Sequence, residues 1–473
     1  MSTIGDKLSM DSELETANQR IVIVGGGISG LSAAWYLQQT APNLRIDVIE
    51  AEHRWGGKIV THREVGFIVD GGPDTFVTRK PEVWNLAGEL DLHSRVIDAG
   101  SETRDIHVMH DGHLYPIPLS PSAFLRSNLI TWRGKLRMIA EPLVPTRRDF
   151  EDESLSAFVD RRLGAEARQR FLAPVLAGIY NANPDRQSIM TTSPVMREME
   201  RQHGGLFRGA LARMLSARTN ENPEKEPPAR FINFESGAEE LIDTLVENLD
   251  ARLRLNTDVQ SIENADGRYK LTLSDGSQVT TDQVILATPA NVSASLLNDI
   301  APSAARLLSQ IDFASIGTLA LVYQPGDLHF DFPIRGLMIP RKEKRIIDAI
   351  TWTTAKLPER TPGNEEMLRV FFGGARPETA AMPVDELLPL VRQELEKILG
   401  VQTEPSRVFH FAWPHGYPQA DVGHLQLVEK IEAELPAGIF VTGSSYRGLA
   451  VPDCINQSIQ TTARITGTLI SSA

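Results

Sequence analysis

The sequence contains 473 residues, of which 41% are hydrophobic and 23% are charged. At roughly 150 residues per domain this length predicts about three structural units with a sizeable core, and the composition excludes disordered and fibrous proteins. The formal net charge of -13 argues against a dedicated nucleic-acid binder, because neutralising phosphates requires a basic face.

Cys454 is the single cysteine, so we expect no intrachain disulfide and a reducing compartment, the cytoplasm. Residues 1–20 carry several carboxylates and lack the apolar run of a secretory signal. No run of about 18 strongly apolar residues occurs, so we expect no membrane-spanning helix. Contact with a membrane surface stays open.

The first regular elements form a β-α-β unit. Residues 21–24 are a β-branched run that predicts a buried parallel strand, and this run leads directly into Gly25-Gly26-Gly27-Ile28-Ser29-Gly30. Apolar residues at helical spacing predict a helix over 31–37, and a second predicted strand over 46–49 ends at Glu50.

The spacing Gly25-x-Gly27-x-x-Gly30 is typical of a dinucleotide-binding turn. Its glycines allow a tight turn, close approach of the backbone to a pyrophosphate and close packing of helix on strand, while the helix N-terminus faces the phosphates. Glu50 follows about 20 residues on, where a carboxylate accepts hydrogen bonds from ribose hydroxyls and repels a 2'-phosphate. The alternative is a plain glycine-rich loop, but this context favours FAD or NAD.

The middle of the chain changes character twice. Residues 91–215 follow a mainly helical pattern broken by prolines, which predicts a helical insertion, and 220–228 are polar and proline-rich, as at an exposed domain boundary. A capping box formed by Ser236 and Glu239 predicts a helix over 237–249. Predicted strands follow at 253–262, 269–273 and 278–286, the last two joined by a hairpin.

Two segments after Glu50 distinguish FAD from NAD. They are Arg54-Trp55-Gly56-Gly57-Lys58 and Phe67-Ile68-Val69-Asp70-Gly71-Gly72-Pro73. Paired glycines let the backbone lie flat near a flavin ring, and Lys58 offsets phosphate charge; the alternative is two surface turns with a solvated lysine. Both segments resemble signatures of the amine oxidase and porphyrinogen oxidase superfamily of FAD enzymes.

Three later motifs resemble the oxygen-dependent porphyrinogen oxidases, the protoporphyrinogen and coproporphyrinogen oxidases of haem synthesis. They are Pro174-x-x-x-Gly178-Ile179-Tyr180, Phe371-Phe372-Gly373-Gly374-Ala375-Arg376 and Gly443-x-x-Tyr446-x-Gly448-x-Ala450-Val451-Pro452-Asp453-Cys454-Ile455. The last of these is the most specific. The chain departs from the family after Tyr180, where Asn181-Ala182-Asn183 replaces a Gly-Gly or Ala-Gly pair, which leaves the shape of this pocket wall open.

The resemblance implies an α/β and α+β protein with a Rossmann-like FAD-binding domain, a mixed-sheet substrate domain and a helical insertion. The FAD-binding domain is expected to be discontinuous, from residues 18–90, 229–300 and 405–473. The insertion is expected at 91–215. The substrate domain is expected at 301–404 with part of 175–215.

The resemblance also assigns the cofactor contacts. The pyrophosphate is expected at Gly25, Gly27, Ile28, Ser29 and Gly30, and the adenosine ribose at Glu50 and Ala51. The phosphate and flavin region is expected to be lined by Gly57, Lys58, Gly72, Pro73, Asp74 and Thr75. The backbone of Val259 is expected at the adenine, and Trp413, Val451, Pro452 and Ile455 at the isoalloxazine. For Val259 and Trp413, ordinary core packing is the alternative.

The implied reaction is oxidation of a porphyrinogen to a porphyrin, with molecular oxygen as acceptor and hydrogen peroxide as product. The flavin performs this chemistry, so no catalytic side chain and no metal is expected. His107, His110 and His113 have the spacing of a ligand row, but the alternating pattern around them favours a strand and a turn. The four propionates of coproporphyrinogen and the two of protoporphyrinogen leave the choice of substrate open, with a slight lean to coproporphyrinogen III.

The substrate requires cations at the rim of an apolar cavity, since guanidinium groups pair with propionates in two-pronged geometry. Arg79 and Arg104 are the candidate anchors, with Arg376 behind them, and Gly178 is expected to face the ring. For each arginine, the alternative to a role as propionate anchor is an ordinary surface charge.

Residues 125–148 are locally basic and interleaved with apolar side chains, a pattern that fits contact with anionic lipid or a solvated helix face on the cavity wall. The resemblance implies the former, and also handover of the porphyrin to a ferrochelatase. Two other functions fit the same fold: an amine or carotenoid oxidoreductase, and a non-catalytic prenyl-binding carrier of the GDP dissociation inhibitor type.

Overall fold

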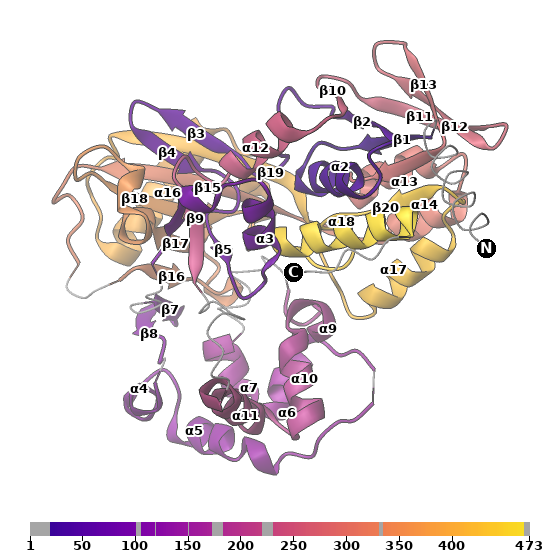
Figure 1. Ribbon diagram of the computed structural model, residues 1–473. Coiled ribbons are helices and arrows are strands. Elements are labelled where there is room, and N and C mark those ends of the chain that lie inside the picture. The colour runs from indigo at the N-terminus through magenta and orange to yellow at the C-terminus, as the bar shows by residue number, and fades with distance from the viewer. Residues whose placement is uncertain are drawn as a thin grey trace.

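The computed structural model describes residues 19–100, 106–118, 120–149, 151–172, 183–219, 230–330 and 334–467. Figure 1 shows two lobes side by side, one built on β1 and α2 and the other on β15 and β18, with a group of helices below them. The fold is a mixed α/β arrangement of several sheets.

A parallel five-stranded sheet forms the centre of the first lobe. Its order is β10 (Arg252–Arg254), β2 (Arg45–Ile49), β1 (Arg20–Val24), β14 (Gln283–Leu286) and β20 (Ile439–Val441). Both faces of β1 are buried, with Ile21 and Ile23 in one core cluster and Val22 and Val24 in another. The continuous β-branched run is therefore explained by burial on two sides.

Helices and a small sheet cover this parallel sheet. One face carries α2 (Ile28–Thr40), α18 (Val451–Thr466), α3 (Glu82–Glu89) and α12 (Glu240–Asn248). The other carries α13 (Ala290–Leu297), α14 (Pro302–Leu308), α17 (His424–Ala433) and the antiparallel strands β11 (Val259–Ala265), β12 (Arg268–Leu273) and β13 (Gln278–Thr281). A further sheet joins β5 (Phe76–Val77), β9 (Phe231–Phe234) and β6 (Val96–Asp98).

A mixed seven-stranded sheet forms the second lobe. Its order is β19 (Arg407–Pro418), β15 (Phe313–Tyr323), β18 (Glu366–Phe372), β17 (Ile347–Trp352), β16 (Gly336–Met338), β7 (Ile106–His110) and β8 (His113–Pro116). Only the β16–β7 pair is parallel. One face packs against α16 (Val384–Leu399), and the other against the hairpin of β3 (Thr61–Glu64) and β4 (Phe67–Asp70). The short helix α15 (Thr353–Lys356) follows β17.

The helical insertion lies below both lobes (Figure 1). Its helices are α4 (Pro121–Arg126), α5 (Trp132–Ile139), α6 (Leu155–Arg162), α7 (Ala165–Ala167), α9 (Ile189–Thr192), α10 (Pro194–His203) and α11 (Leu206–Thr219). The expected range of 91–215 therefore needs correction at its start, because β6, β7 and β8 are strands. Likewise β19 belongs to the mixed sheet, although 405–473 is expected in the FAD-binding domain.

Most local predictions for residues 21–50 and 237–286 agree with the structure. The strand, glycine turn, helix and second strand are present, as is the hairpin between β12 and β13. The capping box of Ser236 and Glu239 is wrong. Glu239 pairs instead with Thr61 of β3: the Glu239 N–H donates to Thr61 Oγ1 at 3.0 Å and the Thr61 N–H donates to the Glu239 carboxylate at 3.1 Å.

Among the described residues, no helix combines the length and the apolar character needed to cross a bilayer.

Buried ions hold the helical insertion together. Arg162 of α6 and Glu141 are both fully buried and pair with each other, and the Glu141 carboxylate also accepts the backbone N–H of Leu206 at 2.8 Å, where α11 begins. Glu200 of α10, also fully buried, pairs with Arg161 at 2.6 Å and lies 3.5 Å from Arg162. Burial raises the pKa of Glu200, but hydrogen bonds and charge from the arginines outweigh burial and hold this pKa below its ordinary value.

Glu141→Gln is expected to lower the free energy of unfolding by about 3 to 5 kcal/mol, because it leaves the Arg162 charge buried without its carboxylate. The control is Glu198→Gln, which removes the exposed partner of Arg201 and is expected to leave the unfolding midpoint near that of the wild type. Urea unfolding followed by circular dichroism measures both. Equal midpoints for all three proteins would show that the buried pair does not support the insertion.

Candidate functional site

The glycine turn lies at the carboxyl edge of the parallel sheet. The register places Val24 of β1 opposite Ile49 of β2 and Leu286 of β14, so the residues that follow these strands meet at one edge. The positive φ of the turn is at Gly25 (108°), whose N–H donates to the Ile49 carbonyl at 2.8 Å. A Cβ on Gly30 would overlap the carbonyl oxygen of Gly25, so Gly30 is required for packing of α2 on β1.

The N-terminus of α2 is suited to an anion. Gly27, its N-cap, has extended backbone (φ -75°, ψ 178°), no side chain caps the helix, and its first turn contains no acidic residue. A Cβ on Gly27 would meet only the Gly57 Cα, at 3.9 Å. Unlike Gly30, Gly27 therefore leaves space beside free helix N–H groups, which is the arrangement that binds a pyrophosphate.

Glu50 is held beside this turn at the end of β2. One of its carboxylate oxygens accepts the Gly26 N–H at 2.6 Å and the other accepts the Glu52 N–H at 2.9 Å. The carboxylate is thus fixed next to the phosphate-binding turn, with lone pairs left for ribose hydroxyls. Ala51 follows it and is exposed.

Arg54 organises the second glycine segment. Its guanidinium donates to the carbonyls of Gly57 at 2.5 Å, Trp55 at 3.1 Å and Ile59 at 3.2 Å. The Trp55 ring lies so close to Gly26 that a Cβ there would overlap it. Arg54 is absent from the predicted contacts, although it opens the Arg-x-Gly-Gly signature, and its side chain shapes the loop rather than facing solvent.

The Gly71-Gly72 turn approaches two other segments too closely for side chains. A Cβ on Gly72 would overlap the carbonyl oxygen of Lys58, and one on Gly71 would overlap the ring of Phe411 on β19. The turn leads to Pro73, Asp74 and Thr75. The segment predicted to line the flavin therefore packs between the Lys58 loop and the mixed sheet.

Asp74 is engaged with cations of the mixed-sheet lobe. Its carboxylate pairs with Lys356 at 2.8 Å and with Arg369 at 3.4 Å. Burial raises the pKa of Asp74, but the charges of Lys356 and Arg369 outweigh burial and hold this pKa well below its ordinary value. The Asp74 carboxylate therefore stays ionised at neutral pH and fixes the turn.

Lys58 is a half-buried cation without a carboxylate partner in the described part of the chain. Burial lowers its pKa, and the neighbouring Cys454 of α18 acts in the opposite direction. Burial also raises the pKa of Cys454 to about 11, so this thiol is protonated at neutral pH. A partly desolvated ammonium group without a carboxylate partner fits an anionic cofactor. Gly416, near Trp413 on β19, would bring a Cβ to 3.3 Å from Lys58 Cε.

The C-terminal motif is packed against the start of α2. Ser458 of α18 donates to the Ser29 carbonyl at 2.7 Å, and Gln457 accepts the Arg447 N–H at 3.0 Å and donates to the Gly448 carbonyl at 3.2 Å. These bonds place Val451, Pro452 and Ile455, in the first turns of α18, next to the glycine turn. Neither Gln457 nor Ser458 is among the predicted contacts, because each acts through the backbone of another segment.

The remaining predicted residues are more scattered. Val259 is buried in the core cluster that contains Val24 and Ile49. Arg79 is exposed, beside Lys80, which pairs with Asp453 at 2.5 Å. Arg376 is half exposed and lies 3.9 Å from Glu378. Arg104 and Gly178, like most of the Pro174–Asn183 segment, lie outside the described residues.

The histidine row forms the hairpin of β7 and β8, as the alternating pattern predicts. Within the described ranges, His110, Asp111 and Glu343 bring one ligand atom each within 4.8 Å of one another. This group does not suit a cation, because Lys342 Nζ contacts His110 Nδ1 and the two Glu343 oxygens accept the N–H groups of Asp111 and Gly112.

The parallel sheet and its glycine turn are typical of dinucleotide-binding proteins, and the edge of the sheet carries a cradle formed by the glycine turns, Glu50 and Lys58. Residues 28–466 match the family of flavin-containing amine oxidoreductases, so the chain belongs to this family. The protein is accordingly an oxidoreductase with FAD as its cofactor, which argues against a prenyl-binding carrier.

Several relatives of this chain are named coproporphyrinogen or protoporphyrinogen oxidases. Coproporphyrinogen III oxidases from Bacillus subtilis (strain 168) and Propionibacterium freudenreichii are 29% and 31% identical, over 94% of this chain and 97% and 90% of their own lengths. Protoporphyrinogen oxidase 2 of Arabidopsis thaliana is 26% identical, covering 93% of this chain and 92% of its own length. A solved structure from Exiguobacterium sp. 255-15, with a protoporphyrinogen oxidase assignment, is 30% identical, with a TM-score of 0.82 over 95% of this chain and 99% of that chain.

Gly27→Val and Gly30→Val are expected to fail differently. Because a Cβ at Gly27 meets only the Gly57 Cα, at the ordinary contact distance of 3.9 Å, Gly27→Val is expected to purify folded and colourless, with FAD affinity lowered at least about tenfold. Gly30→Val is expected to misfold, because its side chain overlaps backbone. Circular dichroism and flavin absorbance distinguish the two; a yellow Gly27→Val protein would exclude this turn as the pyrophosphate site.

Proposed function

We propose that the protein oxidises a porphyrinogen to the porphyrin in haem synthesis, with coproporphyrinogen III favoured over protoporphyrinogen IX. The observation that carries this proposal is identity of 29% and 31%, over 94% of the chain, to proteins named coproporphyrinogen III oxidase. The amine and carotenoid oxidoreductases are less favoured, since the solved amine oxidases are about half as similar, at 16% identity for the putrescine and cyclohexylamine oxidases.

The reaction removes six hydrogens from the macrocycle as three pairs, and three molecules of oxygen accept them to give three of hydrogen peroxide. Bound FAD supplies the two-electron transfers. The chain's part is to hold the cofactor through the α2 N-terminus, Glu50 and Lys58, and to keep a large apolar substrate beside it. We propose no obligatory general base, because this reaction class does not require one.

The propionate tails of the substrate require cations, and we assign Arg79, Arg104 and Arg376 to this role, with Gly178 at the ring face. The structure supports Arg376 in one respect. The carboxylate of Asp348 accepts the N–H groups of Gly374 at 2.6 Å and Ala375 at 2.8 Å, which fixes the turn that presents the Arg376 side chain at the surface.

Turnover of both porphyrinogens by the purified holoenzyme tests the function, with fluorescence of the porphyrin and peroxide release as readouts. Arg376→Ala is expected to raise KM about tenfold or more without changing flavin content, since a charged hydrogen bond contributes about 1.5 to 3 kcal/mol, and Arg376→Lys to recover part of the loss. Arg201→Ala, on the exposed face of α10, is the control. Turnover of neither substrate would contradict the function; an unchanged KM would contradict only the anchor.

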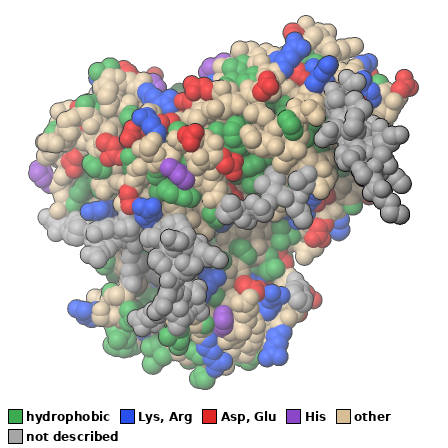
Figure 2. Space-filling model, in the orientation of Figure 1, with side chains coloured by type: hydrophobic (Ala, Val, Ile, Leu, Met, Phe, Trp, Pro, Cys, Tyr) green, Lys and Arg blue, Asp and Glu red, His purple; other side chains and the backbone are tan. Residues whose placement is uncertain are grey.

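The helical insertion carries a surface suited to a membrane, and we propose peripheral contact of a cytoplasmic protein with anionic lipid there. Trp132, Leu136 and Ile139 recur on one face of α5 and are 66%, 63% and 53% exposed, and Leu143, just beyond, is 83% exposed. Figure 2 shows hydrophobic and basic side chains gathered at this end of the molecule. A porphyrin of low solubility released here would pass to a ferrochelatase, which we include in the proposal.

The basic stretch contributes fewer free charges than its composition predicts. Lys135 is buried, with Nζ donating to the Leu125 carbonyl, and Arg137 donates to the carbonyls of Arg161 and Arg162. Three arginines of this stretch have exposed side chains: Arg126, Arg133 and Arg148. The apolar face of α5, rather than charge alone, must therefore supply most of the affinity for lipid.

Trp132→Ser combined with Leu136→Ser is expected to weaken binding to vesicles of anionic phospholipid at least about tenfold, because burial of such side chains contributes about 1.5 to 3 kcal/mol each. The matched control is Val292→Ser on α13, which removes an exposed apolar side chain from the lobe of the parallel sheet. Sedimentation with vesicles measures binding. Equal sedimentation of the double variant and the wild type would exclude this face.

A further inference from the structure

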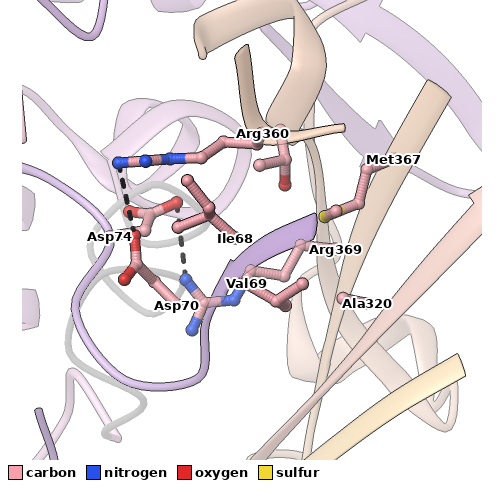
Figure 3. Close-up of a pocket in the computed structure, with 9 residues that line it drawn as sticks. Ile68, Val69, Asp70, Asp74, Ala320, Arg360, Met367 and Arg369 are labelled. Atoms are coloured by element: carbon pink, nitrogen blue, oxygen red, sulfur yellow. Dashed lines mark ion pairs between the residues drawn. The ribbon is translucent and has the colours of Figure 1, made fainter. Parts of the chain in front are cut away.

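A buried ion cluster lies beneath the turn that is predicted to line the flavin. It consists of Asp70, Asp74, Lys356, Arg360 and Arg369, and Figure 3 shows four of these side chains converging on one small space. Three cations face two carboxylates, so the cluster keeps one positive charge.

The space between these side chains has the size of one water molecule. Its volume is about 10 Å³, and its lining includes Asp74, Thr353, Arg360 and Arg369. Thr353 Oγ1, Arg360 Nε and Arg369 Nε are buried and lack a hydrogen-bond partner among the described residues. A polar space of this size, bounded by carboxylates and unsatisfied donors, fits one bound water that bridges them.

Arg369 connects this cluster to the backbone of the turn. From the middle of β18 its Nη2 donates to the carbonyls of Gly71 at 2.6 Å and Gly72 at 2.5 Å, and its Nη1 pairs with Asp74 at 3.4 Å. Thr318 of β15 adds a bond to the Gly71 carbonyl at 3.2 Å. A planar guanidinium can hold three points of one turn in this way, which a lysine cannot.

Arg360 is equally buried but serves another segment. Its guanidinium donates to the carbonyls of Phe234 and Glu235 at 2.9 Å each, at the end of β9, and reaches Asp70 only at 3.9 Å. The two arginines therefore share one cavity and one environment, and differ in whether they bind the Gly71–Thr75 turn.

We propose that Arg369 is a positioning residue for FAD: its guanidinium, with the bridging water, holds the Gly71-Gly72 backbone and Asp74 in the shape that receives the flavin. The inference rests on the assignment of FAD to this cradle. It predicts that the apoprotein keeps its fold without Arg369 but presents a displaced turn. It also predicts that the residual positive charge stabilises the reduced, more anionic form of the flavin, since opposite charges stabilise each other most in a dry interior.

The test compares Arg369→Met, Arg369→Lys and Arg360→Met by FAD titration of the apoproteins, visible circular dichroism and flavin midpoint potential. Wild-type binding of FAD is the prior requirement, and its failure would contradict the cofactor assignment instead. Arg369→Met is expected to raise the Kd for FAD about tenfold or more, to alter the visible spectrum and to lower the midpoint potential. Arg369→Lys is expected to restore the potential more than the Kd, because it restores charge without the fork.

Arg360→Met is expected to lower the melting temperature while the Kd for FAD stays within about twofold of wild type. The proposal is wrong if Arg369→Met binds FAD as tightly as wild type with an unchanged spectrum, or if Arg360→Met raises the Kd equally. Should Arg369→Met fail to fold, Thr318→Val removes one bond to the Gly71 carbonyl with little change in volume. That variant is expected to raise the Kd about twofold to fivefold, and an unchanged Kd would also overturn the proposal.

Discussion

Several backbone segments approach each other so closely that no side chain fits between them, and the rest of the structure depends on this constraint. Gly30 packs against the Gly25 carbonyl, Gly27 faces Gly57, and Gly72 lies on the Lys58 carbonyl. These contacts bring three loops from different parts of the chain to one edge of the parallel sheet. A Cβ on Gly72 would separate its segment from Lys58, and a Cβ on Gly30 would open the first glycine turn, so both positions require glycine.

Several carboxylates of the protein have partners within it, whereas the positive groups at the cradle have none in the described part of the chain. Carboxylates that face the protein, such as Asp74 and Glu141, have arginine or lysine partners, and the Glu50 carboxylate accepts backbone N–H groups. Lys58 and the N-terminus of α2 have no such compensation among the described residues. Positive potential is therefore left uncompensated at the cradle itself, which favours an anionic dinucleotide over any neutral ligand of the same shape.

Local patterns predicted the strands, the glycine turn and the helix of the β-α-β unit, because these parts are short and depend only on neighbouring residues. Pairings between distant segments were not predictable in this way. β7 lies parallel to β16 across more than 200 residues, and β19 joins β15 although its sequence precedes the C-terminal flavin motif. Thr61 replaces the expected Ser236 cap for the same reason, and Arg369 binds backbone carbonyls of a distant turn, which carry no sequence signal.

The interior of the helical insertion explains its unusual surface. Its helices enclose Arg162, Glu141 and Glu200, so part of the volume that an apolar core would fill is occupied by paired ions. The apolar residues of α5 then lie outside, where they would cost free energy in water over a contiguous face. The apolar face of α5, which we propose to meet lipid, lies at the opposite end of the molecule from the parallel sheet (Figure 1).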